Sequence, residues 1–211
     1  MEVEYRPIPR VVLSYPKQTF STYVASLAVP KIIKHCREKG VPVDAYTGIL
    51  NRRRLVLSAI RTAPAGSLVV YIGHGLGGRW IGNEFPYFAG LSRGILTLND
   101  THTLAGRHVI AIACDTFREL GIRALADGAL SYIAWDDKVL VDTLDSNRDN
   151  LPDVADTFAT LVNAMVDYGD PQYAVTTFKY KCEEYINKYL AEGNIAMAEK
   201  MRRNLEGITV Y

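Results

Sequence analysis

Short runs of β-branched and other apolar residues alternate along this chain with stretches of helical periodicity. Six such runs are expected to be strands: 10–15, 41–46, 67–72, 107–113, 129–135 and 208–211. Helices are expected over 21–38, 49–61 and 117–126, the first with a kink or break at Pro30. Strands that alternate with helices indicate a parallel sheet with crossover helices. We therefore expect an α/β fold, a three-layer sandwich with a mainly parallel β-sheet flanked by helices.

The last third of the chain is dominated by helical periodicity. An acidic loop over 136–153 precedes an amphipathic helix with an apolar stripe made by Val154, Phe158, Leu161, Val162, Met165 and Val166. Two more helices are expected, around 171–191 and 195–205. The sequence has no internal repeat and no linker rich in Gly, Ser or Pro, which favours one domain over 1–211 with a mainly helical part from about 151.

Composition narrows the class of protein. The chain has 211 residues and a formal net charge of +1, so neither nucleic acid nor an anionic membrane is expected as a partner. No apolar stretch approaches the roughly 20 residues that span a bilayer, and residues 1–10 do not resemble a signal peptide. The three cysteines are too few and too irregularly spaced for a disulfide framework or a zinc site, which favours a reducing, cytoplasmic location. Of these, Cys36 and Cys182 fall on apolar helix faces and are expected in the core.

Two residue types that catalyse acyl transfer follow two of the expected strands. His74 comes after the strand at 67–72, and Cys114 comes directly after the strand at 107–113. Polar groups gather beyond the carboxyl ends of strands in parallel sheets, and neighbouring strands lie about 4.8 Å apart. If these two strands are neighbours, an imidazole can activate the thiol and later protonate a leaving group. Gly75 then adds a backbone N–H that, with the N–H of Cys114, would form an oxyanion hole.

These segments carry a family resemblance. VVYIGHG, ending at Gly75, and VIAIACDT, ending at Thr116, place the histidine and the cysteine forty residues apart. This arrangement resembles the caspase, gingipain, clostripain and legumain superfamily of cysteine peptidases (clan CD, the caspase–haemoglobinase fold). The resemblance covers roughly 10–135 and implies a cysteine endopeptidase with a His74–Cys114 dyad that acts on peptides or proteins and requires no cofactor.

The same resemblance implies a pocket for the residue on the acyl side of the cleaved bond, called P1. Gingipain-like and clostripain-like members carry an acidic residue near the end of the strand after the nucleophile, where this chain has Asp136 and Asp137. Carried over, these residues imply a preference for Arg or Lys at P1. Ile112, two residues before Cys114, stands where several members have a polar residue that shapes this pocket.

Processing and two rival functions also follow from the resemblance. Many members of the superfamily are cut in the loop after the strand that follows the nucleophile. In this chain that loop follows the expected strand at 129–135 and contains Lys138 and Arg148, so self-cleavage is expected if P1 is basic. One rival is a catalytically silent caspase-like binding or regulatory module. The other is a transpeptidase or ligase that uses the same dyad and passes the acyl group to an amine.

The acidic loop offers a calcium site as an alternative to a simple helix start. Asp145, Asn147, Asp149, Asp153 and Asp156 occupy positions 1, 3, 5, 9 and 12 of an EF-hand-like loop. The pattern departs from that motif at Asn150, where Gly is expected, and at Asp156, where Glu is expected. The favoured interpretation is a polar loop with Pro152 in the first helical turn and Asp153 at the positive end of the helix dipole.

Overall fold

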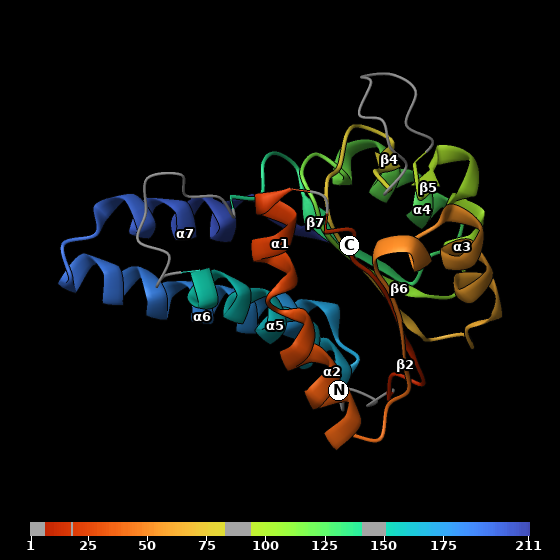
Figure 1. The fold of residues 1–211 in the computed structure, drawn as a ribbon, viewed down its shortest axis with the longest axis horizontal. Coiled ribbons are helices and arrows are strands. Elements are labelled where there is room, and N and C mark those ends of the chain that lie inside the picture. The colour runs from red at the N-terminus through yellow and green to blue at the C-terminus, as the bar shows by residue number, and fades with distance from the viewer. Residues whose placement is uncertain (1–6, 18, 83–93, 141–150) are drawn as a thin grey trace.

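A six-stranded sheet forms the centre of the protein, as seen in a computed structural model that describes residues 7–17, 19–82, 94–140 and 151–211 (Figure 1). The strand order is β2-β1-β3-β6-β7-β8, in which all pairings are parallel except that between β7 and β8. The strands are β1 (Val11–Ser14), β2 (Val43–Tyr46), β3 (Leu68–Ile72), β6 (His108–Ile112), β7 (Ser131–Trp135) and β8 (Ile208–Val210). The expected α/β class with a mainly parallel sheet flanked by helices is therefore confirmed.

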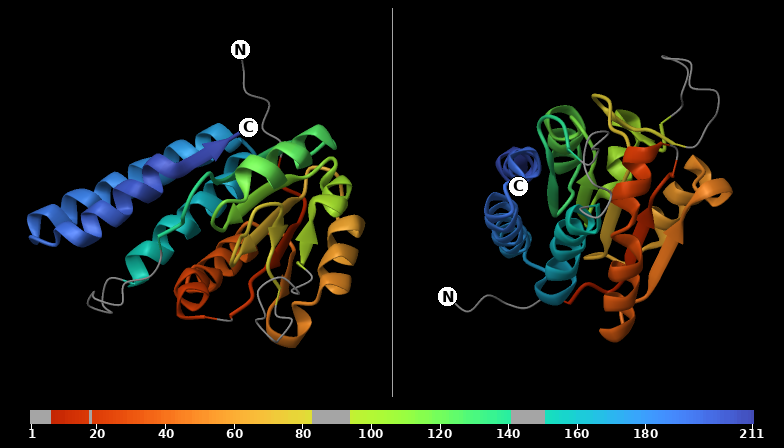
Figure 2. Two further views of the ribbon diagram at one scale, coloured as in Figure 1. Left: turned by 90° about the horizontal axis from the view of Figure 1, so that it is seen from above. Right: turned by 60° about the vertical axis from the view of Figure 1, so that its left-hand side comes forward.

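Helices cover both faces of this sheet, because successive side chains of a strand point to opposite faces. In β3, Leu68, Val70 and Ile72 join one buried cluster, whereas Val69 and Tyr71 join another. The first cluster includes apolar residues of α1 (Phe20–Ser26), α2 (Val29–Glu38), α5 (Leu151–Tyr168), α6 (Pro171–Ala191) and α7 (Ile195–Gly207). The second includes residues of α3 (Arg53–Thr62), α4 (Ile122–Ala126) and the 3₁₀-helix Leu98–Leu104. Figure 2 shows the same elements from two further directions.

The expected helix over 21–38 is divided into two. Pro30 lies in the first turn of α2, where its missing N–H costs nothing, so the predicted break is confirmed. Thr19 caps α1 by accepting from the N–H of Thr22, while the Thr22 hydroxyl accepts from the N–H of Thr19. The start of α1 is thereby fixed at the carboxyl edge of the sheet.

Two further sequence predictions differ from the structure in detail. The expected helix over 49–61 is a 3₁₀ turn, Gly48–Leu50, followed by α3, and the expected helix over 117–126 begins as a π-helical turn, Phe117–Gly121, before α4. A small antiparallel pair, β4 (Arg79–Trp80) and β5 (Leu96–Thr97), lies in a segment where no strand was expected. Pairs this short carry no alternating pattern that a sequence could show.

The C-terminal helices return the chain to the sheet. α6 and α7 form a hairpin that projects beyond it, after which β8 pairs antiparallel with β7 (Figure 1). Trp135, at the end of β7, packs edge-on against Phe158 and Phe178 at centroid distances of 5.9 and 5.7 Å. Among the described residues, no helix is both long enough and apolar enough to cross a bilayer.

Candidate functional site

The strands that precede His74 and Cys114 are neighbours in the sheet. β3 and β6 run parallel with Ile72 opposite Ile112, and the N–H of Gly73 donates to the carbonyl of Ile112 at 3.1 Å. Each of the two candidate residues stands two positions beyond this pair. The sequence prediction required these two strands to lie side by side, and this is confirmed.

Gly75 brings the two strand ends into contact. A Cβ atom at this position would lie 2.0 Å from the carbonyl oxygen of Cys114 and 2.4 Å from Cγ2 of Thr116. Real Cβ atoms do not approach backbone oxygens this closely, so only glycine fits here. Gly75 also forms an antiparallel bridge with Trp80. Gly75 thus lies against the Cys114 backbone, and its role as an oxyanion donor stays a prediction.

The imidazole of His74 is oriented by the first helix. Its Nε2 lies 2.9 Å from the hydroxyl oxygen of Thr19, the residue that caps α1. The His74 carbonyl lies 2.8 Å from the hydroxyl of Tyr71, which stacks on Trp80 at a centroid distance of 4.7 Å. Burial lowers the pKa of His74, so the imidazole is neutral at neutral pH.

Cys114 is half-buried, and its thiol lies against the segment that follows β7. The backbone N–H of Val139 donates to Sγ at 3.4 Å. Burial raises the pKa of Cys114, the hydrogen bond from Val139 lowers it, and the net shift is upward. The next residue, Asp115, has the only positive φ of a non-glycine residue in the described chain, 49°, and its N–H donates to the carbonyl of Asp137 at 3.0 Å. The chain thus turns sharply after the thiol and is tied to the end of β7.

A buried asparagine fixes the segment beside the thiol. The side chain of Asn204, on α7, accepts from the N–H of Leu140 at 2.8 Å and donates to its carbonyl at 2.9 Å. The backbone carbonyl of Asn204 accepts from the indole N–H of Trp135 at 2.9 Å. Neither Asn204 nor Thr19 was predicted from the sequence to lie at the site. The Thr-x-x-Thr capping pattern at 19–22 was a signal for the start of α1, but nothing in the sequence links it to His74.

His74 and Cys114 both border one pocket of about 150 Å³. Its lining comes from α1, the ends of β3 and β6, and the segment after β7. The other lining residues are Ser21, Thr22, Ala25, Gly73, Ile112, Val139 and Leu140. The structure therefore brings together His74, Cys114 and Ile112 among the residues expected at the site.

Neither Asp136 nor Asp137 lines this pocket. Asp136 is directed toward β8, where its carboxylate accepts from the hydroxyl of Thr209 at 3.4 Å. Asp137 is exposed and borders a different pocket, of about 290 Å³, whose charged lining residues also include Lys138, Arg203 and Glu206. The sequence placed these carboxylates correctly after β7 but could not show that β8 and α7 occupy the space next to Asp136.

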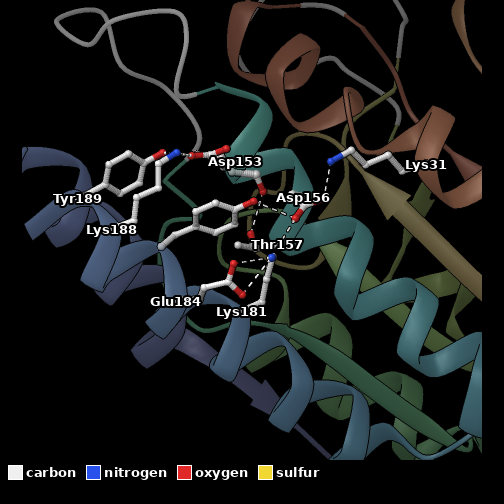
Figure 3. Close-up of polar contacts among 10 residues, drawn as sticks. Lys31, Asp153, Asp156, Thr157, Lys181, Glu184, Lys188 and Tyr189 are labelled. Atoms are coloured by element: carbon white, nitrogen blue, oxygen red, sulfur yellow. Dashed lines mark hydrogen bonds and ion pairs between the residues drawn. The ribbon is translucent and has the colours of Figure 1, made fainter. Parts of the chain in front are cut away.

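The structure describes only part of the expected calcium loop. Asp145, Asn147 and Asp149 lie outside the described residues. Asp153 and Asp156 lie in α5, and their carboxylates face α6 (Figure 3). Asp153 accepts from Lys188 at 2.7 Å and from the hydroxyl of Tyr189 at 2.8 Å. Asp156 is bonded to Lys31 and to the hydroxyl of Tyr185.

Lys188 and Lys31 thus pair with Asp153 and Asp156, the two expected calcium ligands that the structure describes. Among the described residues, no group of three or more His, Cys, Asp or Glu side chains is placed to hold a metal ion. Pro152 and Asp153 lie in the first turn of α5, as the alternative interpretation expected.

The other two cysteines lie in the hydrophobic core. Cys36 and Cys182 are fully buried, as expected, and burial raises their pKa values to about 11 and about 12.

One member of the arginine run at 52–54 has a structural role. Arg53 pairs with the buried carboxylate of Asp100 at 2.5 Å and donates to the carbonyl of Gly94 at 3.1 Å.

No protein-family model matches the chain, and a search of curated proteins finds no match. The function is therefore argued from the geometry of the site.

Proposed function

We propose that the protein is a cysteine peptidase in which Cys114 is the nucleophile and His74 is the general acid and base. One observation carries this proposal. The thiol and the imidazole border the same pocket at the carboxyl edge of a parallel sheet, and Gly75 packs against the backbone of Cys114. The resemblance of the two segments around these residues to caspase-like peptidases supports the same reaction class.

The reaction needs one proton to move between the two side chains. Sγ forms a bond to the carbonyl carbon of the substrate while the imidazole takes the thiol proton. The imidazole gives this proton to the leaving amine as the C–N bond breaks. Water then hydrolyses the thioester, and its proton returns through the imidazole to Sγ.

Thr19 has a positioning role in this scheme. A neutral imidazole carries one hydrogen, so only one of its two nitrogens can accept a proton. When Nε2 carries the hydrogen and donates to the Thr19 hydroxyl, Nδ1 is the nitrogen that accepts the thiol proton. The hydrogen bond at 2.9 Å holds the ring orientation and is compatible with the tautomer that the mechanism requires.

A panel of fluorogenic peptides varied at P1 tests the proposal. Wild-type protein is expected to hydrolyse part of the panel, and Cys114→Ala and His74→Ala are each expected to lower kcat/KM by about 10³-fold or more. His102→Ala is the matched control, because His102 is exposed on the 3₁₀-helix Leu98–Leu104 and does not line the pocket. Its activity should equal that of wild type.

The rival functions give different outcomes in the same experiment. A silent binding module would hydrolyse no peptide, and Cys114 would resist a peptide-based electrophile. A transpeptidase or ligase would give an aminolysis product when an amine acceptor is added, in place of the free acid. Hydrolysis that survives Cys114→Ala would contradict the proposed nucleophile.

Self-cleavage after Lys138 or Arg148 stays a prediction that depends on a basic P1 preference. Arg148 lies outside the described residues. At Lys138, the amide N–H of the following residue, Val139, points at Sγ. A nucleophile must approach the face of a carbonyl carbon, so cleavage at this bond would require the segment to move. An unchanged intact mass after prolonged incubation would contradict self-cleavage.

A further inference from the structure

We infer that the pocket beside Cys114 is the P1 pocket and that it takes an uncharged aliphatic side chain, such as that of valine or leucine. The inference rests on the proposed function and deepens it by naming the class of substrate. It replaces the basic preference that the family resemblance implied.

Position identifies which part of a substrate reaches the pocket. Cys114 and His74 both contribute to its lining, so a carbonyl carbon attacked by Sγ lies at its mouth. The P1 side chain is attached one bond away from that carbon. It is therefore the side chain of the acyl group that meets this pocket first.

Polarity excludes a charged P1 side chain. The lining contributed by Ala25, Ile112, Val139 and Leu140 is apolar. Among the described residues, the lining includes no ionisable group other than the imidazole and the nucleophile itself. A buried ammonium, guanidinium or carboxylate without a counter-charge is strongly disfavoured. The hydroxyl of Thr22 is already engaged, since it donates to the carbonyl of Thr19 at 3.0 Å.

Size sets an upper bound on the side chain. The cavity measures about 150 Å³. An apolar protein cavity of about this volume holds one benzene molecule. Valine and leucine side chains fit within that limit, whereas the benzyl group of phenylalanine and the indole of tryptophan are both larger than benzene. Alanine would leave most of the cavity unfilled and would gain less from burial.

The walls are held in place before a substrate arrives. Ala25 lies on α1 and Ile112 on β6, so both are fixed by regular structure. The part of the lining made by Val139 and Leu140 is anchored by the two hydrogen bonds between Asn204 and the Leu140 backbone. A pocket with fixed walls discriminates by shape, because a poorly fitting side chain cannot be accommodated without breaking these contacts.

The carboxylates that would recognise a basic residue lie elsewhere. Asp136 faces Thr209, and Asp137 borders the separate pocket with Lys138, Arg203 and Glu206. That second pocket contains two acidic and two basic side chains and offers no net attraction to a cation. The charge pattern therefore gives no support to an Arg or Lys preference.

The test uses fluorogenic peptide amides that differ only at P1, with Ala, Val, Leu, Phe, Trp, Asp, Lys and Arg. Val or Leu is expected to rank first, with kcat/KM about 100-fold above Lys, Arg and Asp. A second measurement uses peptide ketone electrophiles with the same P1 series and follows the rate of Cys114 labelling, which needs only one attack by the thiol. The two rankings should agree.

Two variants should move the preference in opposite directions. Ala25→Leu fills the pocket and should lower kcat/KM for P1 Leu about 10-fold or more, with little effect on P1 Ala. Leu140→Ala enlarges the pocket and should favour P1 Phe over Val. Leu190→Ala, a partly exposed position on α6, is the matched control and should leave the ranking unchanged. Thermal unfolding of each variant separates changes in specificity from loss of fold.

The failures of the two proposals are distinguishable. Hydrolysis with Arg or Lys ranked first, or variants that affect all P1 residues equally, would overturn the inference and leave the peptidase assignment intact. If kcat/KM depends on the residue on the amine side of the cleaved bond and not on P1, the pocket binds the leaving group. That result would also overturn the inference. No cleavage and no labelling with any P1 residue would refute the proposed function, and the inference with it.

Discussion

Cys114 rests as a neutral thiol, because burial raises its pKa and outweighs the hydrogen bond from Val139. Since the thiolate is the reactive form, alkylation by iodoacetamide should be slow at pH 7 and should accelerate above pH 9, the ordinary pKa of the group. Rates measured from pH 5 to 10 by mass spectrometry test this. Cys36 and Cys182 are buried and should stay unlabelled, as should Cys114→Ser. A rate that is already maximal near pH 6 would instead indicate a thiolate–imidazolium pair at rest.

Gly75 is the residue whose replacement should disturb the site most directly. In Gly75→Ala, the new methyl group would meet the Cys114 carbonyl oxygen at 2.0 Å, so the two strand ends must separate. A displacement of about 1 Å at a reacting group costs on the order of 100-fold in rate, and we expect kcat/KM to fall by at least this factor. Gly193→Ala is the control, because its methyl group meets no other atom on the α6–α7 turn and its positive φ of 73° makes alanine cost stability there without touching the pocket. Equal activities of the two variants would contradict a close approach at Gly75.

The placement of His74 and Cys114 at one edge of the sheet was predictable from the sequence, whereas the residues that contact the imidazole and the segment beside the thiol were not. His74 and Cys114 each follow a buried β-branched run, and parallel neighbours bring their carboxyl ends to one edge. Thr19 and Asn204 make their contacts across 55 and 64 residues of sequence. Such contacts depend on how helices dock, and no local pattern encodes them.

At the scale of elements, the segment after β7 depends on α7 for its position. Asn204→Ala would leave the N–H and carbonyl of Leu140 without their partner and should lower the free energy of unfolding by about 1–3 kcal/mol. It should also loosen the pocket wall and so reduce the discrimination between P1 Val and P1 Phe. Urea unfolding and the peptide panel measure the two effects. Asn204→Asp would bury a carboxylate against the Leu140 carbonyl and should lose more stability at pH 7 than Asn204→Ala, and a smaller loss would contradict this account.

Elements with strong local signals were predicted well, and those fixed by tertiary contacts were not. β3 and β6 are continuous buried apolar runs, so their positions were predicted to within one residue at each end. The β4–β5 pair is two residues long in each strand and was missed. Asp136 and Asp137 were assigned to the P1 pocket, but the N–H of Asp136 approaches the carbonyl of Gly207 at 3.4 Å, because β8 pairs with β7 on that side.

At the scale of the whole molecule, a network of charged side chains connects α6, in the helical hairpin, to α2 and α5, which pack on the sheet. Asp156 of α5 binds Lys31 of α2 and the hydroxyl of Tyr185 of α6 (Figure 3). Lys181 lies 3.5 Å from the same carboxylate and 4.9 Å from the centre of the Tyr185 ring. Burial alone would raise the pKa of Asp156, but the hydrogen bonds from Lys31 and Tyr185 hold it below 3.8.

A carboxyl whose pKa is lowered on folding stabilises the protein above its unfolded pKa, and this contribution disappears as the pH falls through the folded value. Asp156→Asn should therefore lower the free energy of unfolding by about 1–3 kcal/mol at pH 7, and the difference from wild type should shrink below pH 3.8. Glu199→Gln is the control, because the ion pairs of Glu199 with Arg202 and Arg203 are exposed and should contribute less than about 1 kcal/mol. Denaturant titrations from pH 3 to 7 provide the comparison. A destabilisation of Asp156→Asn that persists unchanged at pH 3 would show that packing of the side chain, and not its charge, joins α2, α5 and α6.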